Sequence, residues 1–216
     1  MKNTLLALAL GLALATACTS SPEEKKLPIL GPREPKVTTV NGKPQVDTVY
    51  HTIPDFAFLD QDSQMVTQQT VANKIYVADF FFTSCPSICP KMKSQMLRVY
   101  EKYKDNPRVV LLSHSIDPAH DTVAVLREYA DRLGVKSATW HFLTGNRDTI
   151  LDLAQQHYFT TAMEDKTVAG GYAHSGAFLL VDEQRRLRGH YDGTKEQDVD
   201  KLLKDMDLLL AEKHGN

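Results

Sequence analysis

The sequence predicts an α/β protein, a three-layer sandwich in which helices cover a mixed central β-sheet. Apolar runs of strand length alternate with segments whose apolar residues recur at helical spacing, which is the pattern of parallel βαβ units. Two later apolar runs, residues 177–181 and 187–191, predict an antiparallel hairpin that precedes a last helix. The expected sheet is therefore parallel in one part and antiparallel at the end of the chain.

The individual elements follow in chain order. Residues 37–50 alternate around Asn41-Gly42, a strong signal for a β-hairpin, although Pro44 restricts the second arm to a sheet edge. Residues 75–82 form a near-continuous apolar run, typical of a buried central strand. The other expected strands are residues 56–59, 109–116 and 140–143, and the expected helices are residues 90–104, 117–132, 147–157 and 194–213. This order is the thioredoxin plan with an N-terminal hairpin extension.

Length and charge restrict the class of protein. A chain of 216 residues is long enough for one ordinary core with some appended sequence, so we expect one globular domain. The 25 Lys and Arg residues nearly balance the 27 Asp and Glu residues, with no block of like charge. Nothing in this balance favours nucleic acid as a partner.

The N-terminus has the anatomy of an export signal. Lys2 precedes an apolar run over residues 5–14, which is shorter than the roughly 20 residues that span a bilayer, and small residues follow before Cys18. We expect a signal peptide over residues 1–17 and a lipid on Cys18, as in a bacterial lipobox, although position 15 is Ala rather than the usual Leu. The chain would then be an exported lipoprotein, anchored to a membrane and facing the periplasm or cell exterior. Simple secretion with a stray thiol is the alternative.

The expected organisation after the signal has three parts. Residues 18–36 are rich in Ser, Pro, Glu and Lys and suit a flexible tether. Residues 37–52 are the hairpin extension, and residues 53–216 are the thioredoxin-like domain.

Two cysteines are expected to carry the chemistry. With Cys18 lipidated, only Cys85 and Cys89 remain, and such a pair in an exported protein is a disulfide, a metal site or a redox pair that alternates between these states. Both lie where a buried strand gives way to a helix, whose N-terminus stabilises thiolates. The i, i+4 spacing lets the two sulfurs face the same side. A purely structural disulfide is disfavoured because so short a loop stabilises little.

His174 is the third candidate. It lies in a glycine-flanked loop ahead of residues 177–181, where a thioredoxin fold normally carries a cis-proline that packs against the cysteine pair. All ten prolines of this chain lie at or before Pro118, so the loop offers an imidazole instead. Two thiolates and one imidazole suit Cu(I), and a fourth position would admit Cu(II) or zinc. The alternative is a loop histidine in ordinary hydrogen bonds.

Two carboxylates are weaker candidates for a role beside the metal. Asp79 lies in an apolar strand, where a buried carboxylate is costly and needs a partner. Asp117 precedes Pro118 and is expected to cap the helix over residues 117–132, with contact to the metal site as the other interpretation. Helical spacing places Met92 and Met96 in the core. No partner spacing indicates a site at three further histidines, His114, His120 and His190.

Four segments of the chain carry a family resemblance. Residues 79–90 (DFFFTSCPSICP), 115–118 with Asp121-Thr122, 140–145 and His174-Ser175 resemble the Sco/SenC family, thioredoxin-like copper proteins that help to assemble the binuclear copper centre of cytochrome c oxidase. The match runs in the same order over roughly residues 53–212. It implies copper binding by Cys85, Cys89 and His174, with the copper-binding subunit of the oxidase or another copper protein as partner. Ala173 departs from the acidic residue often found there, which would affect the orientation of the imidazole.

Two functions remain open after this resemblance, and a third is disfavoured. The first is an extracytoplasmic copper metallochaperone, which requires no catalysis. The second is a thiol-disulfide oxidoreductase acting on the copper-ligand cysteines of a partner, with Cys85 attacking and Cys89 resolving. A peroxiredoxin would carry a threonine three positions before its reactive cysteine, whereas this chain has Phe82.

Overall fold

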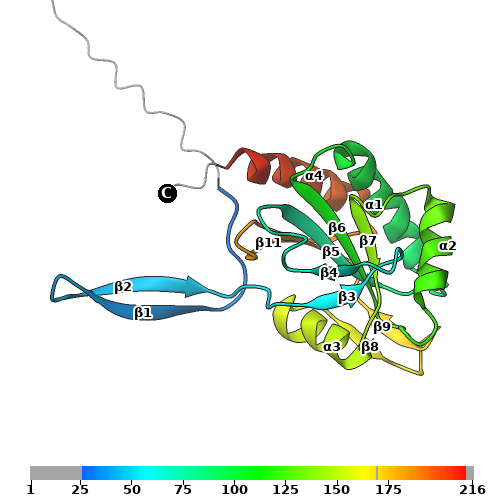
Figure 1. Ribbon diagram of the computed structural model, residues 1–216, viewed down its shortest axis with the longest axis horizontal. Helices are drawn as coiled ribbons and strands as arrows, with labels where there is room; N and C mark the ends of the chain where they lie inside the picture. The colour runs from blue at the N-terminus through cyan, green and yellow to red at the C-terminus, as the bar shows by residue number, and fades with distance from the viewer. Residues whose placement is uncertain (1–25, 169, 213–216) are drawn as a thin grey trace, which may run out of the picture.

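A five-stranded mixed sheet forms the centre of the protein (Figure 1). The computed structural model describes residues 26–168 and 170–212. The strand order is β11-β10-β5-β6-β7; β6 and β7 run parallel to β5, and β10 and β11 form the antiparallel side. The strands are β5 (Ile75–Phe81), β6 (Val109–Ser115), β7 (Trp140–Leu143), β10 (Ala177–Val181) and β11 (Leu187–Asp192). The predicted mixed sheet is confirmed.

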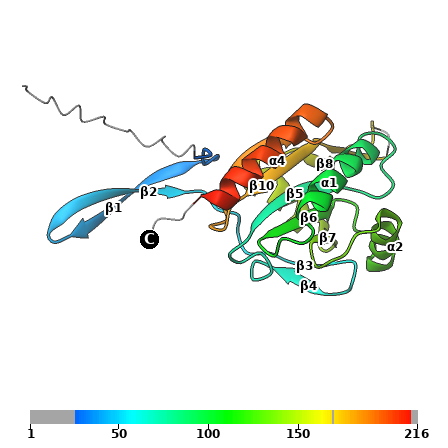
Figure 2. The ribbon, with the colours of Figure 1, turned by 90° about the horizontal axis from the view of Figure 1, so that it is seen from above.

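Helices cover both faces of this sheet. On one face lie α1 (Cys89–Tyr103), α2 (Val123–Leu133) and α4 (Glu196–Ala211); α1 and α4 run side by side (Figures 1 and 2). The opposite face carries α3 (Arg147–Asp152) and the π-helical turn η1 (Leu153–His157). Consecutive strand residues point to opposite faces. Accordingly, Phe81 contacts Tyr129 of α2, and Phe80 contacts Tyr158 next to η1.

Burial explains why β5 and β6 read as unbroken apolar runs. Every residue of both strands is buried, because helices or loops cover each face of the sheet. The helix α1 turns Met92, Met96 and Val99 into the same core, all at 0% exposure. The prediction that these methionines pack in the core is therefore confirmed.

Three short strands were not expected from the sequence. The strand β3 (Ala57–Leu59), which was expected, pairs with β4 (Met65–Thr67). Two more short strands, β8 (Ala162–Glu164) and β9 (Tyr172–His174), precede β10 in the chain and pair with each other. Three residues are too few to show the alternation by which a strand is recognised.

The predicted N-terminal hairpin is confirmed, but its first strand begins at Arg33 rather than at residue 37. It consists of β1 (Arg33–Val40) and β2 (Lys43–Tyr50), and it projects away from the sandwich (Figures 1 and 2). Asn41 and Gly42 both have positive φ, 52° and 75°, as the two central residues of a type I′ turn require.

Residues 26–32 differ from the flexible tether predicted to reach residue 36. Leu27 is buried, and the Leu30 N–H donates to the Leu187 carbonyl at 2.8 Å. The Arg188 guanidinium binds the Leu27 carbonyl, Asp182 and Glu212, and we call these four residues the clasp. Polar composition suggested a free segment, but one leucine and a buried guanidinium that needs acceptors hold it in place. The clasp lies at the start of β11, at the end of the sheet away from the C-terminal end of β5.

Candidate metal centre

Cys85 and Cys89 lie where β5 gives way to α1. The chain leaves β5 after Phe81 and turns, with the Cys85 N–H donating to the Phe82 carbonyl at 3.3 Å. Cys89 is the first residue of α1, and Pro90 stands in its first turn, where a missing N–H costs nothing. Both thiols are free and both are buried. The strand-to-helix placement predicted from the sequence is correct.

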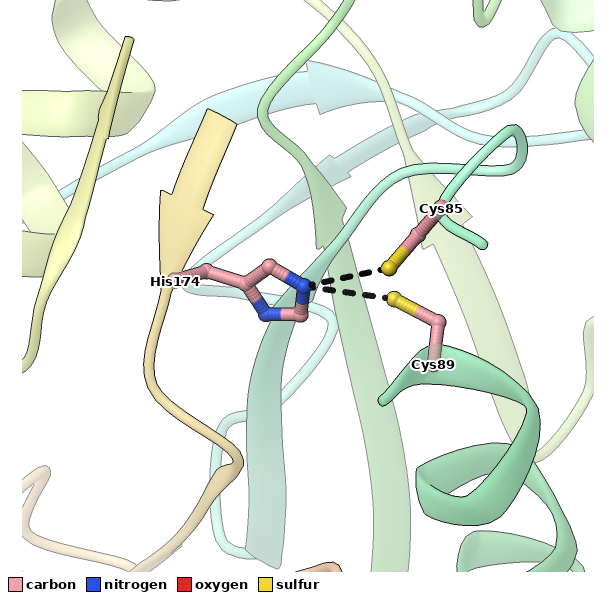
Figure 3. Close-up of side chains that lie close together, drawn as sticks. All are labelled: Cys85, Cys89 and His174. Atoms are coloured by element: carbon pink, nitrogen blue, oxygen red, sulfur yellow. Dashed lines mark hydrogen bonds between the residues drawn. The ribbon is translucent and has the colours of Figure 1, made fainter. Parts of the chain in front are cut away.

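His174 comes from a separate segment and faces both sulfurs (Figure 3). Its Nε2 atom lies 3.6 Å from Cys85 Sγ and 3.4 Å from Cys89 Sγ. The three ligand atoms lie within 4.8 Å of one another. Among the described residues this is the one group of three or more His, Cys, Asp or Glu side chains that converges in this way.

Short strands hold the imidazole in place. His174 ends β9 and pairs with Ala162 of β8, while the Ser175 N–H donates to the Thr161 carbonyl at 2.9 Å. The ring of Phe82 meets the imidazole edge-on, with centroids 5.7 Å apart. The His174 Nδ1 atom is buried with no hydrogen-bond partner within residues 26–168 and 170–212. Ala173 offers no side-chain acceptor for it, in line with the departure seen in the sequence.

The two thiols differ in acidity. Burial by itself raises the pKa of Cys85, but hydrogen bonds from His174 and from the Ser87 and Cys89 backbone outweigh it and lower the pKa to about 6. At Cys89 burial dominates, and the pKa rises to about 12. Near neutral pH Cys85 is therefore the thiolate of the metal-free pair, and Cys89 is the thiol.

Asp79 has the partner that its burial requires. Its carboxylate forms an ion pair with Lys93 of α1 at 2.8 Å and also accepts from the Ser113 hydroxyl. The Lys93 ammonium is itself buried, 3.9 Å from the centroid of the Phe81 ring. Lys93 was not expected from the sequence, although a buried aspartate in an apolar strand calls for a cation and Lys93 lies one helical turn beyond Cys89.

The prediction that Asp117 caps a helix is wrong. The helix α2 begins six residues later, at Val123, and its N-cap is Thr122, whose side chain accepts from the Val125 N–H. Residues 117–121 instead form a turn in which the Asp121 N–H donates to the Asp117 carbonyl at 2.9 Å. The Asp117 carboxylate accepts a hydrogen bond from the Tyr172 hydroxyl at 3.2 Å, and Tyr172 lies two residues before His174. A role for Asp117 beside the metal stays a prediction.

Asp121 was also missed. Its carboxylate is fully buried and binds Thr83 and Ser115 at the ends of β5 and β6. The available signal was its place in Asp121-Thr122, one of the segments that carry the family resemblance. Of the remaining histidines, His114 is buried in the core, while His120 and His190 are exposed. Cys18 lies outside the described residues.

Fold and site together define the class of protein: a thioredoxin-like domain whose dithiol faces an imidazole, which makes it a binder of soft metal ions. The chain belongs to the SCO1/SenC family, whose model matches residues 44–210.

Three solved structures illustrate the relationship. A SCO1/SenC family lipoprotein from Bacillus anthracis str. Ames superimposes with a TM-score of 0.68 at 24% identity, over 74% of this chain and 95% of that one. BsSco, a protein with a disulfide switch and a member of the Sco family of cytochrome c oxidase assembly proteins, gives 0.66 at 26% identity, over 76% and 95%. Copper-bound ScoI of Arabidopsis thaliana gives 0.60 at 25% identity, over 74% and 98%.

The donor set fits a copper ion. With metal–sulfur and metal–nitrogen bonds of about 2.3 and 2.0 Å, the observed S···N separations correspond to angles of roughly 105° to 115° at a shared metal. Nε2 can therefore share one ion with either sulfur with little movement, and all three ligand atoms lie within 4.8 Å of one another. Among the described residues no helix is both long enough and apolar enough to cross a membrane.

Proposed function

We propose that this chain is an extracytoplasmic metallochaperone, which binds copper through Cys85, Cys89 and His174 and passes it to another copper protein. One observation carries the proposal: the His174 Nε2 atom lies within 3.6 Å of both sulfurs. Two thiolates and an imidazole favour Cu(I), and Cu(II) would take a further ligand. The copper-bound relative from Arabidopsis thaliana supports the choice of metal.

Transfer proceeds by ligand exchange from the more open side of the site. Cys85 and His174 lie nearer the surface than Cys89, whose exposure is 2%. A ligand of the acceptor therefore replaces Cys85 or His174 first, and Cys89 releases the ion last. The acceptor is the copper-binding subunit of cytochrome c oxidase or another copper protein, and the description of BsSco as an oxidase assembly protein supports this partner.

The chaperone works outside the cytoplasm on a lipid anchor. Residues 1–17 direct export and are removed, and Cys18 then carries the lipid. The Bacillus anthracis relative is a lipoprotein, which supports the anchor. Mass spectrometry of the mature N-terminus tests it: a diacylglycerol-modified Cys18 is expected, and Cys18→Ala should move the protein from the membrane to the soluble fraction.

A thiol-disulfide oxidoreductase is the second candidate, and the low pKa of Cys85 favours it. The Cys85 thiolate would attack a disulfide of the partner, which forms a mixed disulfide and releases one partner sulfur as a thiol. Cys89 would then attack the Cys85 sulfur of that mixed disulfide and release the other partner sulfur. The partner gains two thiols, and a Cys85–Cys89 disulfide forms. Reduction of copper-ligand cysteines in an oxidase subunit would prepare them for the metal.

Copper stoichiometry and spectroscopy test the main proposal. The chain from residue 18, with Cys18→Ser, is reduced under nitrogen; this chain keeps Leu27, which a chain from residue 36 would lose together with the clasp. One copper with sulfur and nitrogen neighbours is expected by X-ray absorption, with sharply weaker binding in Cys85→Ala, Cys89→Ala and His174→Ala. His190→Ala, at an exposed histidine, is the control. Parent binding no tighter than a control protein, or a silent His174→Ala, would make the oxidoreductase the better proposal.

A further inference from the structure

A buried carboxylate supports the loop that carries the first cysteine. Asp121 is 0% exposed and lies just before the N-cap of α2. It accepts from the Thr83 N–H at 3.0 Å, from the Thr83 hydroxyl and from the Ser115 hydroxyl. Thr83 is two residues before Cys85, and Ser115 is the last residue of β6. The carboxylate thus ties the start of the cysteine loop to the end of the neighbouring strand.

The environment of this carboxylate differs from that of Asp79. Asp79 is paired with the Lys93 ammonium, whereas Asp121 has no ion-pair partner among the described residues. An ionised carboxylate without a cation is costly to bury, and here three N–H or O–H donors offset the cost. Two of the three donors belong to Thr83, so most of this interaction acts on the cysteine loop itself.

We propose that Asp121 is a positioning residue for copper binding, an inference that rests on the proposed function. By holding both the backbone and the hydroxyl of Thr83, it sets the direction in which the chain leaves β5 and so the position of Cys85 Sγ. The imidazole of His174 comes from a separate strand, β9, which pairs with β8, so its position is set independently of Thr83. Metal ligands need placement within about 0.5 Å, so loss of this support weakens the shared site.

Asp60 provides a matched control. It is equally buried, at 1%, and accepts from the N–H groups of Asp62 and Gln64 at 2.8 and 2.9 Å. Its other oxygen lies 2.9 Å from His141 Nδ1. This carboxylate supports the β3–β4 turn and touches neither cysteine segment, so Asp60→Ala imposes a comparable structural loss away from the copper ligands.

The test measures Cu(I) affinity by competition with bicinchoninic acid, beside the thermal midpoint, in the chain from residue 18 with Cys18→Ser. Asp121→Ala is expected to weaken Cu(I) binding at least about tenfold, the scale on which loss of support to a ligand acts. Asp60→Ala should lower the thermal midpoint but keep the affinity within about twofold of the parent. Asp121→Asn should restore most of the affinity, because its amide oxygen accepts from the Thr83 N–H while its NH₂ donates to the Thr83 hydroxyl oxygen.

Thr83→Val is the milder variant, since it removes one of the two bonds to Thr83 and keeps the buried carboxylate. An intermediate loss of affinity is expected, and this variant decides the question where Asp121→Ala does not fold. The inference is overturned if Asp121→Ala, or Thr83→Val in its place, binds Cu(I) within twofold of the parent, or if Asp60→Ala weakens binding as much. A parent chain that binds no Cu(I) would instead refute the proposed function.

Discussion

An alkylating reagent is expected to distinguish the two cysteines of the metal-free protein. With a pKa of about 6, Cys85 is about nine-tenths thiolate at pH 7, whereas a pKa of about 12 leaves about one part in 10⁵ of Cys89 ionised. Thiolate nucleophilicity falls with pKa, with a Brønsted coefficient of about 0.4–0.5. The two pKa values, about 6 and about 12, differ by about six. The Cys89 thiolate is therefore intrinsically about 250 to 1,000 times more nucleophilic than the Cys85 thiolate, which offsets part of its lower abundance. At pH 7 Cys85 should therefore react about 90- to 360-fold faster than Cys89.

The assay is timed iodoacetamide labelling from pH 5 to 9, followed by peptide mass spectrometry. The rate at Cys85 should rise with pH through an inflection near 6 and then level, while the rate at Cys89 keeps rising tenfold per pH unit. His174→Ala removes a hydrogen bond that lowers the pKa of Cys85, so its inflection should move to higher pH; His190→Ala is the control. Equal labelling of both thiols at pH 7, or an inflection unmoved by His174→Ala, would refute the reasoning.

Three further predictions concern stability. Burial lowers the pKa of His114 to about 4, so below pH 6.5 the unfolded chain takes up a proton that the native ring does not. The free energy of unfolding should therefore fall by about 3 kcal/mol between neutral pH and pH 4. Urea unfolding of His114→Leu should not show this fall. Parallel pH profiles of parent and variant would contradict this. Lys93→Met leaves Asp79 buried and unpaired and should cost about 3–5 kcal/mol in denaturant titrations, largely recovered by adding Asp79→Leu; no recovery would argue against the pairing. Thr122→Ala should lower the free energy of unfolding by about 1 kcal/mol and Thr122→Ser by much less, and equal losses would show that the cap is not the cause.

Much of the sheet could be predicted because burial on both faces leaves a plain signal. Residues 75–82 are apolar apart from Asp79, and the structure covers all of β5. The hairpin was equally clear, since Asn41-Gly42 meets the positive φ requirement of its turn. Elements of this kind are specified by residues close together in the chain.

The start of α2 could not be predicted, because a distant contact decides it. Asp117-Pro118 satisfies the local pattern for a helix start, yet the chain continues in a turn until Thr122. In that turn Asp121 points inward to Thr83, a partner 38 residues away. Local sequence patterns cannot predict a hydrogen bond between residues so far apart in the chain.

The site divides in the same way. Four-residue spacing at a strand-to-helix junction singled out Cys85 and Cys89. His174 lies 85 residues beyond Cys89, and before the family resemblance only its glycine-flanked loop and the absence of a proline favoured it. Its imidazole reaches the sulfurs through β8 and β9, whose three-residue lengths leave no periodic pattern. Lys93 escaped notice because Lys91, Ser94 and Gln95 beside it make it look like an ordinary exposed helix residue, and only the burial of Asp79 explains its inward position.

The clasp has a mechanical consequence. Whatever precedes Lys26 in the chain joins the domain at Arg188 and the start of β11, the end of the sheet opposite the thiols and the imidazole. A force on the chain N-terminal to Lys26 would act on the ion pairs of Arg188 with Asp182 and Glu212 and on the hydrogen bonds of β11. The loops that hold the metal ligands lie outside that load path. A force applied at this end of the sheet would therefore act on β11 and the ion pairs of Arg188 before it reached the metal ligands.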